Sequence, residues 1–138
     1  MTDYLEWQFS SHLLGSGTFT KPSTTAIALT RNAPLDADTG SSNTELANTG
    51  AYARQTLNPG FTNWTDPVAV DGIQYNLATI TFPVATADWG WVSGVLICSS
   101  ATYATGLAYV KGNLTTPKLI GNGDQLIISV SGIALTYA

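Results

Sequence analysis

The stretch ITFPVATADWGWVSG, residues 80–94, combines the strongest strand pattern of this sequence with its sharpest break. Branched and aromatic side chains alternate between residues 77 and 82, which is the pattern of a β-strand with one face in a core. Pro83 is predicted to end this strand, because proline has no N–H to donate to a neighbouring strand. A second strand is predicted over residues 91–97. The stretch therefore predicts two strands joined by a sharp corner.

The corner between these strands carries the residues that we interpret as defining the fold. Thr86 or Asp88 could cap a single helical turn, and Gly90 can take a positive φ that other residues avoid. We expect Trp89 to fold back over one end of the core, because a large apolar ring is stabilised by leaving water. With Pro83, these residues favour a structural corner, and a binding site here is the alternative.

The length and composition predict one domain over residues 1–138 and restrict its partners. Charged residues make up 10% of the chain, which leaves a neutral surface rich in hydroxyl groups. The net charge is −4 and the five basic residues are dispersed, so we expect no nucleic-acid partner. No apolar run approaches the roughly 18 residues of a membrane span, and no signal peptide is recognisable. We therefore expect synthesis in a cytoplasm and no membrane partner.

Catalytic, cofactor-binding and nitrogen or sulfur metal sites are not predicted. His12 is the one histidine and lies beside an apolar stripe, without a nucleophile motif to accompany it. Cys98 is the one cysteine, so no intramolecular disulfide can form, and its apolar neighbours indicate a small buried side chain. One histidine and one cysteine cannot supply a zinc-type ligand set.

Two groups of carboxylates have spacings that could suggest a site. Asp36, Asp38 and Gly40 are spaced like the start of a calcium loop, but the glycine and the later glutamate fall at the wrong positions. Asp66 and Asp71 could in principle cleave a glycoside as a pair. Both precede a turn-forming residue, which is the ordinary position of a turn aspartate. We expect neither a calcium site nor hydrolase activity.

Residues 3–14, DYLEWQFSSHLL, predict the one helix, with Thr2 or Asp3 as its cap. Its apolar stripe consists of Leu5, Phe9 and Leu13. Packing of this stripe on its own sheet is favoured, and packing on a neighbouring subunit is the alternative. The candidate interface residues are Tyr4, Leu5, Trp7 and Phe9.

The other predicted strands are residues 24–31, 51–57, 68–70, 73–82, 107–113, 117–120 and 126–137. Residues 32–49 form a long polar loop, and Asp71 with Gly72 predicts a tight hairpin. Gly132 is expected to mark a bulge or bend in the last strand. Many short strands with one helix indicate an all-β antiparallel sandwich, which we expect to be jelly-roll-like. A closed barrel is the alternative.

Four segments carry a resemblance to a known family: ITFPVATADWG, TAIALTRNAP, YARQTL and LTTPKLIGNGDQLIISVSGIALTY. In this order they resemble small virion proteins of tailed bacteriophages, which are described as tail-fibre-like or as head decoration and cement proteins. The chain departs from the pattern over residues 98–106, where an acidic residue and a glycine-rich turn are expected. That departure leaves the conformation of this loop open. The resemblance implies a structural protein of the virion.

Two functions follow from this resemblance and from the surface composition. The favoured one is capsid decoration, with the major capsid protein as partner and a homo-oligomer, expected by analogy to be a trimer. The scarcity of charges and of lysines on the long strands suits a surface that neighbours cover. The alternative is a fibre module that binds host-surface carbohydrate by stacking sugar rings on aromatic side chains. Its candidate platforms are Trp64 (beside Asn63, Thr65 and Asp66), Trp91, Tyr103 and Tyr109.

Overall fold

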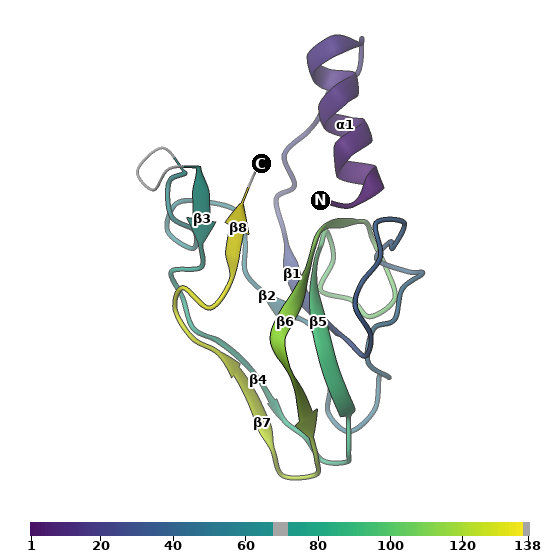
Figure 1. Cartoon of the computed structure of the whole chain (residues 1–138), viewed down its shortest axis with the longest axis vertical. Coiled ribbons are helices and arrows are strands. Elements are labelled where there is room, and N and C mark those ends of the chain that lie inside the picture. Colours follow the sequence, from purple (N-terminus) through teal and green to yellow (C-terminus); the bar gives the residue numbers. More distant parts are fainter. Residues whose placement is uncertain (68–71, 137–138) are drawn as a thin grey trace.

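The computed structural model describes residues 1–67 and 72–136 (Figure 1). Its elements are α1 (Asp3–Leu14), β1 (Ala26–Thr30), β2 (Gln55–Thr56), β3 (Ile73–Tyr75), β4 (Ile80–Val84), β5 (Gly90–Cys98), β6 (Ala108–Ile120), β7 (Gln125–Ile128) and β8 (Ala134–Thr136). The predicted helix is confirmed with the predicted bounds. The predicted long loop, residues 32–49, is also confirmed, with one bridging residue at Glu45.

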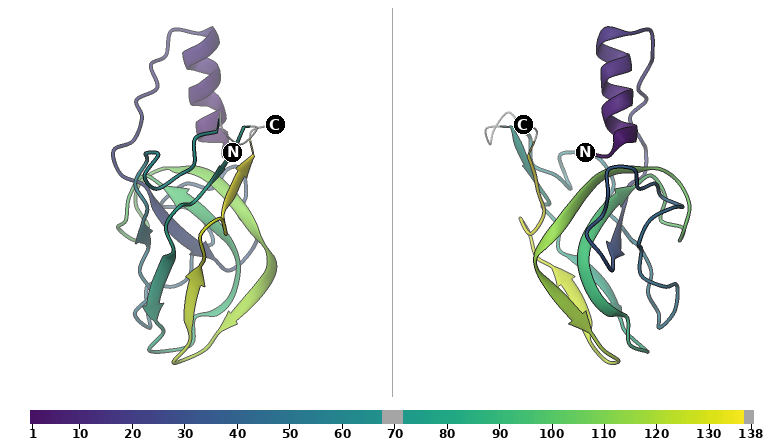
Figure 2. Two further views of the ribbon diagram at one scale, coloured as in Figure 1. Left: turned by 90° about the vertical axis from the view of Figure 1, so that its left-hand side faces the viewer. Right: turned by 45° about the vertical axis from the view of Figure 1, so that its right-hand side comes forward.

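The strands form two antiparallel layers. The first layer is a four-stranded sheet in the order β2-β1-β5-β6. The second layer consists of the pairs β3-β8 and β4-β7, which follow one another along the chain like one long ribbon (Figure 2). Apolar side chains of both layers meet in one core. The predicted all-β antiparallel sandwich is confirmed, and the described strands do not close into a barrel.

The ribbon is interrupted once in each of its strands, and Asn76 joins the two interruptions. This fully buried side chain donates hydrogen bonds from Nδ2 to the carbonyl oxygens of Ala78 and Ser129, at 2.9 and 2.8 Å. Its Oδ1 accepts the N–H of Ile133 at 2.8 Å. The predicted strands 73–82 and 126–137 are therefore each divided in two, and Gly132 lies in the second break.

The corner after β4 holds Trp89 as predicted. Its side chain is 5% exposed, lies edge-on to the ring of Tyr52 and donates from Nε1 to the carbonyl oxygen of Gly50 at 2.7 Å. Gly90 has the expected positive φ of 83°. Asp88 Oδ1 accepts the N–H of Asn122 at 2.8 Å instead of capping a helical turn, and residues 85–90 contain no such turn.

Pro83 does not end its strand, so that prediction was wrong. It lies inside β4, at an irregularity of the pairing between Thr81 and Val84 with β7. A proline is tolerated there because the irregular register removes the need for its missing N–H. Residue 84 then pairs with Gln125.

Three other predicted strands differ from those observed. Residues 51–57 contribute only the two-residue β2, because the positive φ of Gly50 and Ala51 starts the segment in a turn. The predicted strands 107–113 and 117–120 are one continuous strand, β6, whose register against β5 shifts between Asn113 and Lys118. The predicted strand 68–70 and Asp71 of the hairpin lie outside the described residues, and β3 pairs with β8.

Candidate interaction surface

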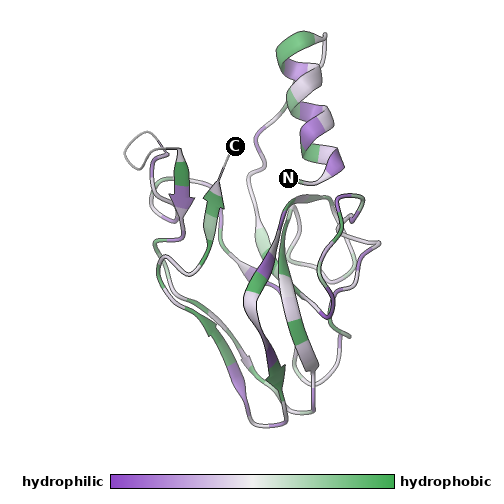
Figure 3. Ribbon diagram, in the orientation of Figure 1, coloured by the Kyte–Doolittle hydropathy of each residue, from purple (hydrophilic) through white to green (hydrophobic). Residues whose placement is uncertain are grey.

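Helix α1 projects from one end of the sandwich and buries none of its own residues (Figures 1 and 2). Its large apolar side chains Trp7, Phe9, Leu13 and Leu14 are between 58% and 85% exposed. Figure 3 shows hydrophobic and hydrophilic residues alternating along the helix. The expectation that its stripe packs on its own sheet was wrong, because the chain directs the helix away from the sheet. Of the predicted interface residues, Trp7 and Phe9 are thereby left exposed, whereas Tyr4 and Leu5 are half-buried.

The helix is attached to the sandwich at its first turn. Thr2 occupies the N-cap position, which was one of the two predicted. Its side chain is buried and donates from Oγ1 to the carbonyl oxygen of Ala108 at 2.6 Å, so the hydroxyl makes no capping hydrogen bond to the helix. The N–H groups of Thr2 and Asp3 donate to the carbonyl oxygens of Tyr109 and Asp36. The Tyr4 ring packs 5.8 Å from the Tyr109 ring. These contacts fix where the helix starts and leave its last two turns in solvent.

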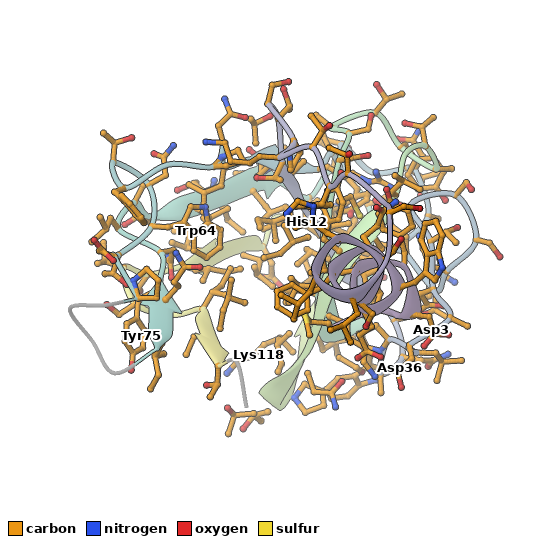
Figure 4. The ribbon with its side chains drawn as sticks, turned by 90° about the horizontal axis from the view of Figure 1, so that it is seen from above. Asp3, His12, Asp36, Trp64, Tyr75 and Lys118 are labelled. Atoms are coloured by element: carbon orange, nitrogen blue, oxygen red, sulfur yellow. The ribbon has the colours of Figure 1, made fainter. Side chains whose placement is uncertain are left out.

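The far end of α1 is hydrogen-bonded, within residues 1–67 and 72–136, to its own return segment. His12 is exposed, and its Nδ1 accepts the N–H of Phe19 at 3.4 Å. The N–H of Gly15 donates to Ser11 within the last turn. Figure 4 looks down on the helix, with His12 near the middle of the view and Tyr75 at its left. The geometry gives His12 a structural contact at the helix end.

An apolar groove lies along one side of the sandwich, where the described strands of one layer do not pair with those of the other. Its upper part, a hollow of about 450 Å³, lies below α1 and has walls that include Leu5, Phe19, Phe61, Trp64 and Tyr109. Its lower part, a hollow of about 220 Å³, lies between β6 and the strands β7 and β8 and has walls that include Leu114, Leu126 and Ile128. Ile97, Val110 and Leu135 line both parts. We call these two hollows together the seam groove.

The charged side chains that line the seam groove, among the described residues, are Lys21 in the upper part and Lys111 in the lower part. Lys111 Nζ lies 2.6 Å from Asp36 Oδ1. The hydrogen bond from Lys111 lowers the pKa of Asp36 below its usual value. Asp36 is thus engaged in an ion pair, and the Asp38 carboxylate accepts the N–H of Leu35 at 2.7 Å in a turn.

The aromatic residues proposed as sugar platforms fall into different environments. Trp64 is buried, at 6% exposed, and its backbone bridges to Asn76, so it does not offer an open ring face. Trp91 is 58% exposed on β5, opposite Leu119 on β6. Tyr103 and Tyr109 are half-buried. Burial raises the pKa of Tyr109, and the neighbouring Tyr4 raises it further. Of these four, Trp91 alone presents most of its surface to solvent.

Neither a cluster of metal ligands nor a membrane-spanning helix is present in the part of the chain that the structure describes. Residues 1–67 and 72–136 contain no group of three His, Cys, Asp or Glu side chains placed to hold a metal ion. Asp66 is exposed, and Asp71 lies outside the described residues, so their separation is not defined. The helix that is described is also too short and too polar to cross a membrane.

A buried ion pair on the edge of the four-stranded sheet was not predicted from the sequence. The side chains of Arg54 and Glu45 are 0% and 3% exposed, and Arg54 Nη2 lies 2.6 Å from Glu45 Oε2. Burial alone would lower the pKa of Arg54, but the hydrogen bonds and charge of Glu45 outweigh it and raise that pKa. Tyr52 donates to Glu45 Oε1 and accepts the N–H of Leu29, at 2.9 Å each. The sequence signal for this cluster was the alternation of the predicted strand 51–57, which places Tyr52 and Arg54 on one face.

Arg54 also joins two loops that are distant in sequence. Its remaining donors bind carbonyl oxygens of Gly40, Ser100 and Thr105, at 2.7, 2.9 and 3.0 Å. The second of these loops, residues 99–107, includes most of the segment 98–106 whose conformation the sequence left open. Beneath both loops lies a small cluster that contains Cys98, whose pKa burial raises to about 11. Cys98 is thus a buried apolar side chain, as predicted.

The sandwich, the uncovered helix and the seam groove together define a small all-β protein with large apolar surfaces for interaction. The family model described as podophage GP4 fiber I protein gp80 matches residues 1–136, and the chain therefore belongs to this family. Membership identifies it as a structural protein of the phage virion, as the resemblance of its segments implied. A search of curated proteins found no match.

Proposed function

We propose that this protein is a structural subunit of a podophage fibre and that it associates with further copies of itself through α1. The family description supports a fibre. The observation that carries the proposal is the helix itself, which buries none of its residues in the chain that contains it. A helix with large apolar side chains on its surface is stabilised when a partner covers them.

The exposed apolar side chains of α1 supply a large part of the free energy that association needs. Burying one such side chain fully contributes about 1.5 to 3 kcal/mol. The helix exposes four such side chains, Trp7, Phe9, Leu13 and Leu14, which are already partly covered. Burying the part that is still exposed would contribute about 4 to 8 kcal/mol per helix. The loss of free motion on association costs about 4 to 15 kcal/mol, so several helices per assembly, or a helix and a second surface, are needed. A homo-oligomer such as the expected trimer meets this requirement.

The test replaces these four side chains with glutamine, which keeps the helix propensity and adds no charge. We expect the variant to keep its β-sheet circular dichroism and to elute with the mass of a single chain in light scattering. A control with Val84→Thr and Val130→Thr removes exposed apolar surface outside the helix and should assemble like the parent. A glutamine variant with the same mass as the parent would refute the role of α1.

Capsid decoration is the second candidate, with the major capsid protein as the partner. Its support is the low charge of the surface and the same uncovered helix, which could dock on a capsid as well as on a copy of itself. The copy number per virion separates the two functions. A decoration protein is present on the order of hundreds of copies and a fibre subunit on the order of a dozen. Quantitative mass spectrometry of purified virions measures this number.

Binding of host-surface carbohydrate by the fibre rests on Trp91. An exposed indole on a sheet surface can stack on the apolar face of a sugar ring. Its exposure of 58% supports this role, whereas the burial of Trp64 argues against a platform there. Trp91→Ala should weaken binding to host cells at least about tenfold, with a melting temperature close to that of the parent. Unchanged binding would rule out Trp91 as the platform.

A further inference from the structure

We propose that the seam groove of one copy receives helix α1 of a second copy. The inference rests on the proposed role of α1 in self-association and adds the surface to which the helix binds. It would make the contact between copies heterologous, because two different surfaces meet.

The helix cannot fill the groove of its own chain. Its first turn is fixed by the buried Thr2 and by the backbone hydrogen bond from Asp3 to Asp36. From there it leads away from the sandwich, as Figures 1 and 2 show. Only Leu5 of the helix lines the upper hollow. An apolar helix to cover the rest of the groove must therefore come from another molecule.

The dimensions of the two surfaces agree. A helix of 12 residues is about 18 Å long, since each residue adds about 1.5 Å. The groove follows β6 from Tyr109 to Thr115, which is about 20 Å at about 3.3 Å per residue. The groove is therefore long enough for the last two turns of α1, which lie in solvent.

The chemistry of the two surfaces is also complementary. The walls of the groove are largely aliphatic and aromatic, and β6 is the edge strand of its sheet, so this side of the sandwich is uncovered in a single chain. Lys21, which is exposed, lines the upper hollow, whereas the first turn of α1 carries Asp3 and Glu6. Lys111 in the lower hollow is already paired with Asp36. Opposite charges at one end of an apolar contact fix its orientation more than its strength.

Two variants separate the helix from the groove. The first is the helix variant described above, with four glutamines in α1. The second, the rim variant, combines Asn113→Glu with Ala134→Glu, which places carboxylates on exposed positions that line the lower hollow. A matched control, Thr56→Glu with Thr81→Glu, adds the same charge at exposed positions on the other side of the sandwich, between β2 and β4.

The inference predicts complementation between the variants. Each variant alone should have the mass of one chain, 14.5 kDa, and the control should assemble like the parent. An equimolar mixture of the two variants should form a pair of twice that mass. In this pair the rim variant supplies an intact helix and the helix variant supplies an intact groove. The mass is measured by light scattering after gel filtration, with circular dichroism to show that each variant is folded.

Each other outcome identifies what is wrong. If the rim variant assembles like the parent while the helix variant does not, the groove inference is overturned and the proposed function stands. If both variants are single chains but their mixture forms no pair, the helix does not bind in the groove, and the inference is again overturned. If the helix variant assembles like the parent, the proposed role of α1 fails, and with it the inference.

Discussion

Replacement of Arg54 by methionine should destabilise the protein more than any surface substitution. The guanidinium group donates five hydrogen bonds, two to the Glu45 carboxylate and three to backbone carbonyl groups. These five bonds use every N–H donor of an arginine side chain. Methionine has a similar length and apolar stem, so the substitution removes the charge and the donors with little change in volume.

The magnitude follows from the burial of the partner. In Arg54→Met the Glu45 carboxylate, which is 3% exposed, keeps the Tyr52 hydroxyl as a donor but loses its counter-ion. Breaking a buried ion pair from one side costs about 3 to 5 kcal/mol, against a total stability of about 5 to 15 kcal/mol. For a domain of this size the melting temperature should fall by about 10 to 15 °C.

Thermal unfolding followed by circular dichroism measures this change, and hydrogen exchange should show faster opening of residues 99–107. The double variant Arg54→Met with Glu45→Gln is the control, because it leaves no buried charge without a partner. We expect it to be more stable than Arg54→Met alone, with a coupling energy of about 0.5 to 3 kcal/mol. If Arg54→Met melts within about 2 °C of the parent, the ion pair does not hold the loops and this reasoning is wrong.

Three further predictions concern the corner, the buried thiol and the absence of hydrolysis. Trp89→Ala should cost about 3 to 5 kcal/mol and give molten or insoluble protein, and a cooperative melt near that of the parent would contradict its place in the core. Burial raises the pKa of Cys98 from 9.0 to about 11, so its contribution to stability is complete below about pH 9 and is lost as the pH rises towards 11. The melting temperature should fall across this range, and it should fall less steeply in Cys98→Ala; an equal slope would contradict the shift. We expect no turnover of bacterial surface polysaccharide, and an activity that disappears in Asp66→Asn would place the protein among the hydrolases.

The corner and the helix show what local sequence signals can predict. Trp89 is buried and Gly90 has a positive φ, as their residue types indicated, because both preferences act within a few residues. The bounds of α1 also follow from local pattern, since a helix depends on side chains three or four positions apart. The antiparallel sandwich was predictable from the spacing of strands and turns.

The same local signals failed where distant partners decide the structure. Pro83 continues its strand because the pairing with β7 is irregular at that point. Arg54 is buried because Glu45 and the loop at residues 99–107 surround it. Neither environment can be read from neighbouring residues, because each is assembled from segments far apart in the chain.

The class of fold, the position of the helix, the central corner and the family were therefore predictable from the residues alone. The projection of α1 from the sandwich and the open groove beside β6 depend on contacts between distant segments, which no local pattern records. An apolar stripe has the same pattern whether it faces its own core or another molecule, since periodicity records which residues share a face. The direction of that face is set by the contacts at the first turn, where Thr2 is anchored to the distant strand β6.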